Sequence, residues 1–189
     1  MARRPSRPRR PRRGRSVRPV RIVVLRHGPA ETRDPVRWPD DRRRPLSAKG
    51  LAQTRRVVRG LAGLIGPVRQ VASSPALRAR RTAELLARSL GRPAALELWI
   101  ELDVDGSAEP ILARARRVAG PRATIVLVGH EPSLSELVGL AVTGEGASIV
   151  RLSKGGAACL EFPVALRPGA GRLRWLLTRK QLAARGAAR

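Results

Sequence analysis

Two short apolar runs constrain the fold of this chain most strongly, because each is rich in β-branched residues and each ends near one of its only two histidines. The run 20–25 leads into His27, and the run 124–128 leads into His130. Runs of this length bounded by Gly and Pro are typical of strands buried in a parallel sheet. Ligands bind beyond the carboxyl ends of such strands. The pattern therefore predicts a composite site with both imidazoles, although either histidine alone would commonly be an ordinary loop residue.

The rest of the chain alternates between helix-like and strand-like segments. Helices are predicted over 47–64, 73–90, 107–119 and 132–142, with Ser47, Ser73-Ser74-Pro75 and Ser107 at three of their starts and Gly91 ending the second. Strands are predicted over 20–25, 68–72, 94–99 and 123–128, followed by antiparallel strands over 147–152, 156–162 and 172–178. Strands alternating with helices predict an α/β fold, a three-layer α/β/α sandwich with a mostly parallel central sheet.

Length and composition suit one domain with a tail at each end. Of the 189 residues, we expect the domain to span 20–180 and a flexible C-terminal tail to span 181–189. Residues 1–19 are Arg, Pro, Ser and Gly with scarcely any apolar side chain, so we expect a disordered tail. Three interpretations of this tail stay open: a solvated polybasic segment, an arm for nucleic acid or a membrane surface, and an over-extended gene start with a valine-type start at Val17 or Val20.

The net charge of +25 is weaker evidence of function than it first suggests. Only Lys49, Lys154 and Lys180 among the 39 basic residues are lysines. This skew toward arginine, with abundant Ala, Gly and Pro, is typical of a GC-rich genome. The charge favours anionic ligands, but the chain has no tyrosine and few aromatic residues on which bases could stack. We therefore expect no nucleic-acid partner except non-specific binding through the tail.

The single cysteine and the hydropathy pattern exclude several classes of protein. Cys159 excludes an internal disulfide and a cysteine-built metal site, and we expect neither a metal nor a cofactor. No run approaches the ~20 apolar residues of a membrane span, and the Arg-rich start lacks the apolar region of a signal peptide. The expected protein is cytoplasmic, without a membrane partner.

The segment Arg26-His27-Gly28 carries the sharpest chemical signal. An imidazole at a strand end, beside a glycine that permits close approach of a ligand, suits nucleophilic attack on an anion. The guanidinium of Arg26 offers a planar donor fork that matches phosphate oxygens. Gly28 is equally consistent with an ordinary turn.

Three later segments add cationic groups. Arg78 lies in the first turn of a predicted helix, where free N–H groups and the helix dipole already favour an anion. Gly129-His130 ends the strand expected to be central, and Arg44 lies just before the helix that begins near Ser47. The neighbouring Arg42 and Arg43 are attributed to composition alone.

Four segments in this order resemble the histidine phosphatase superfamily, the phosphoglycerate mutase-like proteins. They are Arg26-His27-Gly28, Arg44-Pro45-Leu46-Ser47, the Ser-Pro-x-x-Arg-Ala-x-x-Thr pattern from Ser74 to Thr82, and Gly129-His130. The short first loop is similar to that of the SixA-type phosphohistidine phosphatase branch. The resemblance covers about residues 20–180. Pro29 and Arg81 depart from the residues usual in the family.

The resemblance implies a metal-independent reaction in which His27 is the nucleophile and forms a phosphohistidine intermediate. Arg26, Arg78 and a protonated His130 would hold the phosphoryl oxygens, with Arg44 and Gly28 as further substrate ligands. Such a constellation stabilises phosphoryl transfer by positioning and charge. The general acid is open: Asp41 is the preferred candidate, and a surface carboxylate paired with an arginine is an equally good interpretation of the same residue.

Several functions therefore compete. The leading hypothesis is a hydrolase acting on phosphohistidine in proteins, because no lid-sized insertion is evident. A small-molecule phosphomonoesterase or mutase of the same superfamily is the alternative, although a mutase needs a closing lid. A non-catalytic polybasic binding protein on the same fold is disfavoured because Arg26, His27, Arg78 and His130 are all present.

Overall fold

A computed structural model describes residues 19–91 and 95–187, and its central element is a six-stranded mixed sheet. The strand order is β3-β2-β4-β1-β5-β6. Strands β1 (Val20–Arg26), β2 (Gln70–Ser73), β3 (Ala95–Leu98) and β4 (Thr124–Gly129) run parallel, while β5 (Ala157–Phe162) and β6 (Arg172–Leu177) add an antiparallel edge. The predicted mostly parallel α/β sandwich is confirmed.

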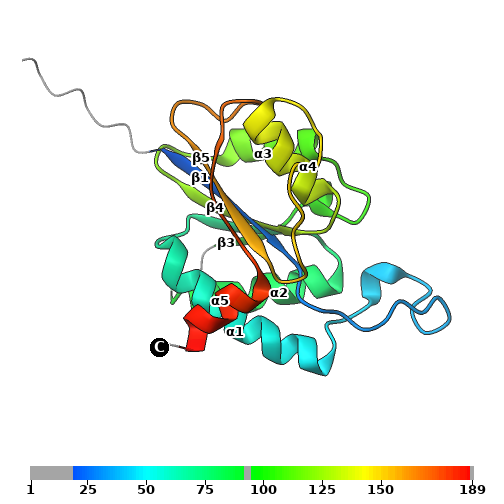
Figure 1. Cartoon of the computed structure of the whole chain (residues 1–189). Coiled ribbons are helices and arrows are strands. Elements are labelled where there is room, and N and C mark those ends of the chain that lie inside the picture. The colour runs from blue at the N-terminus through cyan, green and yellow to red at the C-terminus, as the bar shows by residue number, and fades with distance from the viewer. Residues whose placement is uncertain (1–18, 92–94, 188–189) are drawn as a thin grey trace, which may run out of the picture.

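Helices cover both faces of this sheet (Figure 1). On one face lie α1 (Ala48–Ile65), α2 (Leu77–Ser89) and α5 (Arg179–Ala187), and on the other lie α3 (Ala108–Val118) and α4 (Ser133–Thr143). Alternate residues of β1 enter the two cores: Ile22 and Val24 face α3 and α4, whereas Val23 and Leu25 face α1, α2 and α5. Because side chains alternate along a strand, a continuous apolar run is what a strand buried on both faces requires.

Local signals explain most helix ends. The Ser47 hydroxyl accepts a hydrogen bond from Gly50 N–H and caps α1 as predicted, and Gly91 follows α2 with a φ of +70°, the left-handed conformation that commonly ends a helix. Helix α2 begins at Leu77, later than predicted. Ser74 does not cap it. Its backbone N–H continues the sheet by donating to Val128 O, and its hydroxyl accepts from Ala76 N–H, ahead of the helix, and donates to Asp103 Oδ1.

Two predictions about the C-terminal part are wrong. No strand forms over 147–152, because the backbone of Leu152 is engaged by site side chains: its N–H donates to Glu131 Oε1 and its oxygen accepts from Arg26. Residues 181–187 are not a tail but belong to α5, which buries Leu182 against α1. The predicted tail at 1–19 lies outside the described residues, apart from Pro19.

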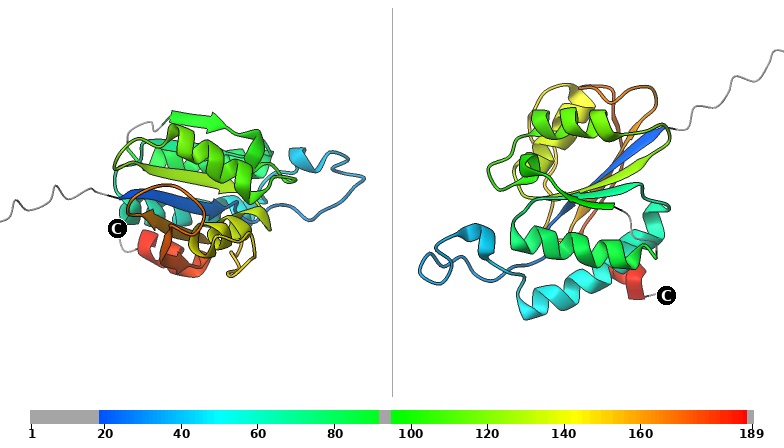
Figure 2. Two further views of the ribbon diagram at one scale, coloured as in Figure 1. Left: turned by 90° about the horizontal axis from the view of Figure 1, so that it is seen from above. Right: turned by 180° about the vertical axis from the view of Figure 1, so that it is seen from behind.

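The segment 29–47 stands out from the body, as the further views show (Figure 2). It contains the short 3-10 helix η1 (Asp41–Arg43) and is joined at its base by an isolated bridge between Ala30 and Leu46. A second 3-10 helix, η2 (Ile100–Leu102), follows β3. Across residues 19–91 and 95–187, none of the helices is long and apolar enough to cross a membrane.

Candidate active site

The carboxyl ends of β1 and β4 border a pocket of about 450 Å³ that contains most of the residues predicted from the sequence. Its lining includes Arg26, His27, Asp41, Arg44, Arg78 and His130. The two imidazoles lie side by side, with ring centroids 5.0 Å apart. Residues separated by about a hundred positions in the sequence thus form one cationic site, as the strand-end argument predicts.

The sheet and the turn after β1 fix the position and the tautomer of His27. Its backbone N–H donates to Gly129 O at 3.1 Å. The ring Nδ1 lies 2.7 Å from the carbonyl oxygen of Gly28. Because a carbonyl oxygen can only accept, Nδ1 carries the proton of the neutral ring and Nε2 keeps its lone pair. This is the tautomer that a nucleophilic nitrogen needs.

The environment of His27 keeps the ring neutral. Burial, followed by the neighbouring His130, lowers the pKa of His27 to about 2. Arg78 and Arg26 act in the same direction, while the Gly28 carbonyl opposes them. The lone pair on Nε2 is therefore available over the whole ordinary range of pH.

Gly28 has a different role from the predicted one of substrate ligand, since it does not line the pocket. Its N–H donates to Thr82 Oγ1 at 3.1 Å. A Cβ atom at this position would collide with Thr54 Oγ1. Glycine is needed here because α1 and α2 close tightly on the turn, and its carbonyl orients His27; ligand approach is not the reason.

His130 is held by a hydroxyl and a buried carboxylate. Its Nε2 lies 2.9 Å from Ser74 Oγ, and that hydroxyl donates to Asp103 Oδ1 at 3.2 Å. A hydroxyl has one proton, so once Ser74 gives it to Asp103, Nε2 of His130 must be the donor in the other contact. The neutral ring is then unprotonated at Nδ1.

His130 is neutral in the pocket without an anion, whereas the predicted protonated ring concerns the phosphate-bound site and stays a prediction. Burial, followed by the positive charge of Arg78, lowers the pKa of His130 to about 3, although Asp103 and Asp41 partly oppose this. Without a bound anion, the ring is neutral near pH 7. A phosphoryl dianion in the pocket would favour the protonated form.

Arg78 and Arg44 both bind the carboxylate of Asp41. Arg78 lies in the first turn of α2 and donates to Asp41 Oδ2 at 2.9 Å and to the Asp41 carbonyl at 2.7 Å. Arg44 donates to Asp41 Oδ1 at 2.8 Å. The two cations predicted to bind phosphate are thus adjacent, and an internal anion lies between them.

The same contacts contradict the role of proton donor for Asp41. Its hydrogen bond from Arg44, with the charges of Arg78 and Arg44, lowers the pKa of the carboxyl below its ordinary value despite partial burial. The group is a carboxylate at neutral pH and has no proton to give. The alternative interpretation, a carboxylate paired with arginine, is the one the structure supports.

Arg26 reaches the pocket from the last residue of β1. One of its terminal nitrogens donates to Leu152 O at 2.8 Å, which ties β1 to the segment before β5. Burial lowers the pKa of Arg26, with Glu131 opposing, and the group remains a cation. Its Nε is buried without a hydrogen-bond partner among the described residues.

Several lining residues are missed by the sequence argument: Arg33, Val104, Asp105, Glu131 and Lys154. Lys154 lies in the turn before β5, where Gly155 N–H donates to His27 O at 2.9 Å. Burial, together with Arg26, lowers the pKa of Lys154. The Gly155-Gly156 pair in the sequence indicates a turn here, but it does not indicate that the turn lies beside β1.

Arg42, which the sequence argument attributes to composition alone, also has a structural role. Its Nε donates to Asp103 Oδ2 at 2.6 Å, so it helps to hold the carboxylate that orders Ser74 and His130. Asp103 is buried, and its hydrogen bonds from Arg42 and Val104 outweigh burial and lower its pKa. The set Arg42, Asp103, Ser74 and His130 is a continuous polar connection into the pocket.

The arrangement combines one neutral nucleophilic nitrogen with cations that can hold an anion. Guanidinium groups match the tetrahedral oxygens of a phosphoryl group. Within the part of the chain that the structure describes, no group of three His, Cys, Asp or Glu side chains is arranged to hold a metal ion.

Comparisons with known proteins agree with this geometry. The sequence pattern of the histidine phosphatase superfamily (branch 1) matches residues 22–107. An uncharacterized protein of Picosynechococcus sp. is 35% identical over 153 residues, which cover 80% of this chain and 87% of the relative.

Solved structures of phosphatases share the fold. The protein histidine phosphatase SixA complexed with tungstate has a TM-score of 0.73 at 24% identity, covering 86% of this chain and 99% of its own. A putative phosphohistidine phosphatase SixA from Nakamurella multipartitia has a TM-score of 0.69 at 24% identity over 84% and 95%. A putative α-ribazole-5′-phosphate phosphatase from Escherichia coli has a TM-score of 0.65 at 18% identity over 85% and 98%.

Proposed function

The chain belongs to the histidine phosphatase superfamily, and from that premise we propose that it hydrolyses phosphohistidine in proteins through a phosphoenzyme on His27. The substrate is thus of the SixA type. The pairing of Asp41, the preferred candidate for the acid, with both Arg44 and Arg78 is the observation that carries this choice. Both Asp41 and Asp103 have pKa values shifted downward, so neither keeps a proton for a leaving group.

The basicity of the leaving group determines how strongly the reaction depends on a general acid. An ester releases an alkoxide, which is strongly basic and needs a proton as the P–O bond breaks. A phosphohistidine that is protonated at its second ring nitrogen releases neutral imidazole, whose conjugate acid has a pKa of about 6.5. Protonation from solvent is sufficient for that group, so a site with ionised carboxylates suits a P–N bond better than a P–O bond.

In the first step, the lone pair of His27 Nε2 attacks phosphorus. A P–N bond to His27 forms while the P–N bond to the substrate ring breaks. The departing nitrogen keeps the electron pair of that bond, and the ring, which solvent has protonated at its other nitrogen, leaves as neutral imidazole. The Gly28 carbonyl at 2.7 Å from Nδ1 stabilises the positive charge that develops on the His27 ring. The substrate phosphoryl group displaces Asp41 from Arg78 and Arg44, and Arg26 contributes a third guanidinium.

His130 supports the same step by taking up a proton. The neutral ring offers only a lone pair at Nδ1, which repels a phosphate oxygen. A bound dianion raises the pKa of His130 from about 3, so binding is coupled to protonation, after which Nδ1–H can donate to the phosphoryl group. Asp103 aids this change through Ser74.

In the second step, water attacks the phosphorus of phosphorylated His27. The P–N bond breaks, the electron pair returns to Nε2, and inorganic phosphate leaves as dihydrogen phosphate with both protons of the water. The neutral tautomer of His27 is thereby restored. Since side-chain cations supply the positive charge, we expect the reaction to need no metal.

A small-molecule phosphomonoesterase is the second candidate. Arg33 and Lys154 line the same pocket and could hold a further anionic group of a compact substrate. Such a substrate would have to bring its own proton source, because the carboxylates described above are ionised.

The test compares a phosphohistidine-bearing protein with sugar phosphates and phosphoglycerates, each in the presence of EDTA. We expect the phosphohistidine protein to be hydrolysed with a kcat/KM at least about a hundredfold higher. Rapid acid-free quenching should trap an acid-labile phosphoenzyme in the wild type and none in His27→Ala. Faster hydrolysis of the esters would overturn the substrate class, and turnover by His27→Ala would overturn the mechanism.

A further inference from the structure

A second hollow of about 810 Å³ lies beside the active-site pocket and has an apolar floor. Trp38, Pro39, Pro45, Pro75 and Leu77 form this floor, and we call the hollow the Trp38 groove. Leu77, the first residue of α2, is an apolar side chain that is 43% exposed. Apolar side chains gathered in an open concavity are typical of a surface that binds a partner.

The rim of the Trp38 groove is positively charged. It carries Arg37, Arg42, Arg43 and Arg80 against the single carboxylate of Asp40. Arg42 is occupied by Asp103, and Arg80 by Glu84. Arg37 lies over the Trp38 ring at 5.2 Å, so aromatic surface and positive charge are adjacent. An apolar floor with an arginine rim is complementary to an acidic segment that carries an apolar side chain.

The Trp38 groove and the active-site pocket share one stretch of backbone. Asp41 and Arg44 line the pocket, while Arg42, Arg43 and Pro45 between and after them line the groove. At the start of α2, Leu77 lines the groove and the next residue lines the pocket. Successive Cα atoms are about 3.8 Å apart, so a chain leaving the pocket reaches the groove within a few residues.

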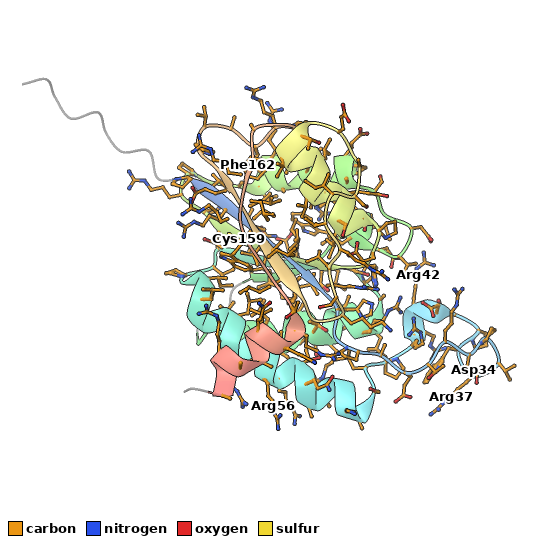
Figure 3. All side chains as sticks on the ribbon, viewed as in Figure 1. Asp34, Arg37, Arg42, Arg56, Cys159 and Phe162 are labelled. Atoms are coloured by element: carbon orange, nitrogen blue, oxygen red, sulfur yellow. The ribbon has the colours of Figure 1, made fainter. Side chains whose placement is uncertain are left out.

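We propose that the Trp38 groove docks the polypeptide around the phosphohistidine of a protein substrate, and that it selects segments with acidic residues and one apolar side chain. The proposal rests on the proposed function for the identity of the phosphorylated residue. Side chains of the loop 29–47 thus recognise the protein while the strand ends act on the phosphoryl group. Figure 3 labels Arg37 and Arg42 on this loop and Arg56 on α1, outside it.

The experiment uses the full chain and two synthetic peptides with the same central histidine. One peptide carries flanking Asp and Glu residues and a leucine, and the other carries Ser and Lys. Each is labelled with fluorescein, and Kd is measured by anisotropy without phosphorylation. After chemical phosphorylation, kcat/KM is measured and compared with that for free phosphoramidate.

We expect the acidic peptide to bind at least about fivefold more tightly than the basic one. Trp38→Ala and Arg37→Glu should each remove most of that preference in Kd and in kcat/KM. Arg56→Glu, the same charge change on an exposed residue of α1, should leave both unchanged. Phosphoramidate hydrolysis should be the same in all four proteins.

Equal binding of the two peptides, or an equal preference in Trp38→Ala, Arg37→Glu and the wild type, would overturn the docking site. If phosphorylated peptides and phosphoramidate are not hydrolysed while the preference in Kd persists and depends on Trp38, the docking site stands and the proposed function fails.

Discussion

The active-site pocket has two unlike walls, and the contrast between them explains how the site is built. The strand-end wall contains Arg26 at the end of β1, His27 and His130 just after β1 and β4, and Arg78 in the first turn of α2, and the sheet and α2 hold these residues. The loop wall contains Asp41 and Arg44, which lie in or beside η1, a helix with no buried residue. Ion pairs, rather than a ladder of backbone bonds, hold the loop wall. The chemistry thus rests on the rigid wall, and the adaptable wall carries the residues that a substrate must displace.

The largest expected difference between the two walls is in the loss of activity when Arg78 of the strand-end wall or Arg44 of the loop wall is replaced. Arg78 is the cation that lies deepest, with its side chain 4% exposed against 12% for Arg44. We expect Arg78→Ala to lower kcat/KM by about 10²–10³-fold, the size of effect seen when one oxyanion donor is removed, and Arg44→Ala by about tenfold. Steady-state kinetics on a phosphohistidine substrate measures both. Equal losses would show that the loop wall is as much a part of the catalytic centre as α2.

Acid should destabilise the strand-end wall before the loop wall. The folded-state pKa values of His27 and His130 are about 2 and about 3, while an unfolded histidine titrates near 6.5. Below that pH the unfolded chain binds protons that the folded chain does not, so the free energy of unfolding falls as pH falls. Each ring contributes a slope of about 1.4 kcal/mol per pH unit between roughly pH 6 and 5.

Urea unfolding of wild type and His130→Asn over that window measures the slope. The variant should lose about half of this slope. As an internal control, the free energy of unfolding of both proteins should not change between pH 7.5 and 8.5. Asp41, with its lowered pKa, contributes stability that is lost only at lower pH, as its carboxylate protonates. An equal slope in His130→Asn would show that His130 is not neutral in the folded chain.

Asp103 links the two walls, since it binds Arg42 of η1 and, through Ser74, His130. Removing its charge should lower kcat/KM by about tenfold. In Asp103→Asn the Ser74 hydroxyl faces a neutral amide that can donate as well as accept, so His130 should populate both tautomers and protonate less readily when phosphate binds. We expect kcat/KM to fall by about tenfold, with the fall growing toward higher pH. Nitrogen chemical shifts of His130 report the tautomer, and Glu109→Gln, an exposed acid on α3, serves as the matched control.

The smallest effect is expected at Asp41. If its carboxylate competes with phosphate for Arg78 and Arg44, Asp41→Asn should lower the inhibition constant of inorganic phosphate by about threefold, the value of a partly exposed ion pair. Asp34→Asn, on the same loop, should leave the constant unchanged. A hundredfold fall in kcat with an unchanged inhibition constant would instead restore Asp41 as the proton donor.

The strand-end wall could be predicted from the sequence because strand periodicity, chain punctuation and helix starts are local signals. Arg26, His27, Arg78 and His130 each stand at the end of a strand or the start of a helix. Their convergence follows from the parallel arrangement, without knowledge of any long-range contact.

The remaining parts depend on contacts that no local pattern encodes. Arg42 reaches Asp103 across 61 positions, from one loop to another, and in a chain this rich in arginine its role was hidden by composition. Lys154 reaches the pocket only because β5 pairs antiparallel with β1. The strand expected over 147–152 fails for a related reason, since tertiary hydrogen bonds replace the ladder there.

The position of His27, the proposed nucleophile, at the end of a central strand also sets how the molecule is expected to lose activity. The amide of His27 donates to Gly129 O and that of Arg26 to Gly156 O, on opposite sides of β1. Amides in such a central strand are released for hydrogen exchange only when the whole domain opens, whereas η1 can open by itself. Exchange measured by mass spectrometry should therefore find His27 among the slowest amides and 41–43 among the fastest. During mild denaturation, activity should therefore fall first because η1 opens and substrate recognition is lost. His27 should leave its position only when the whole domain unfolds.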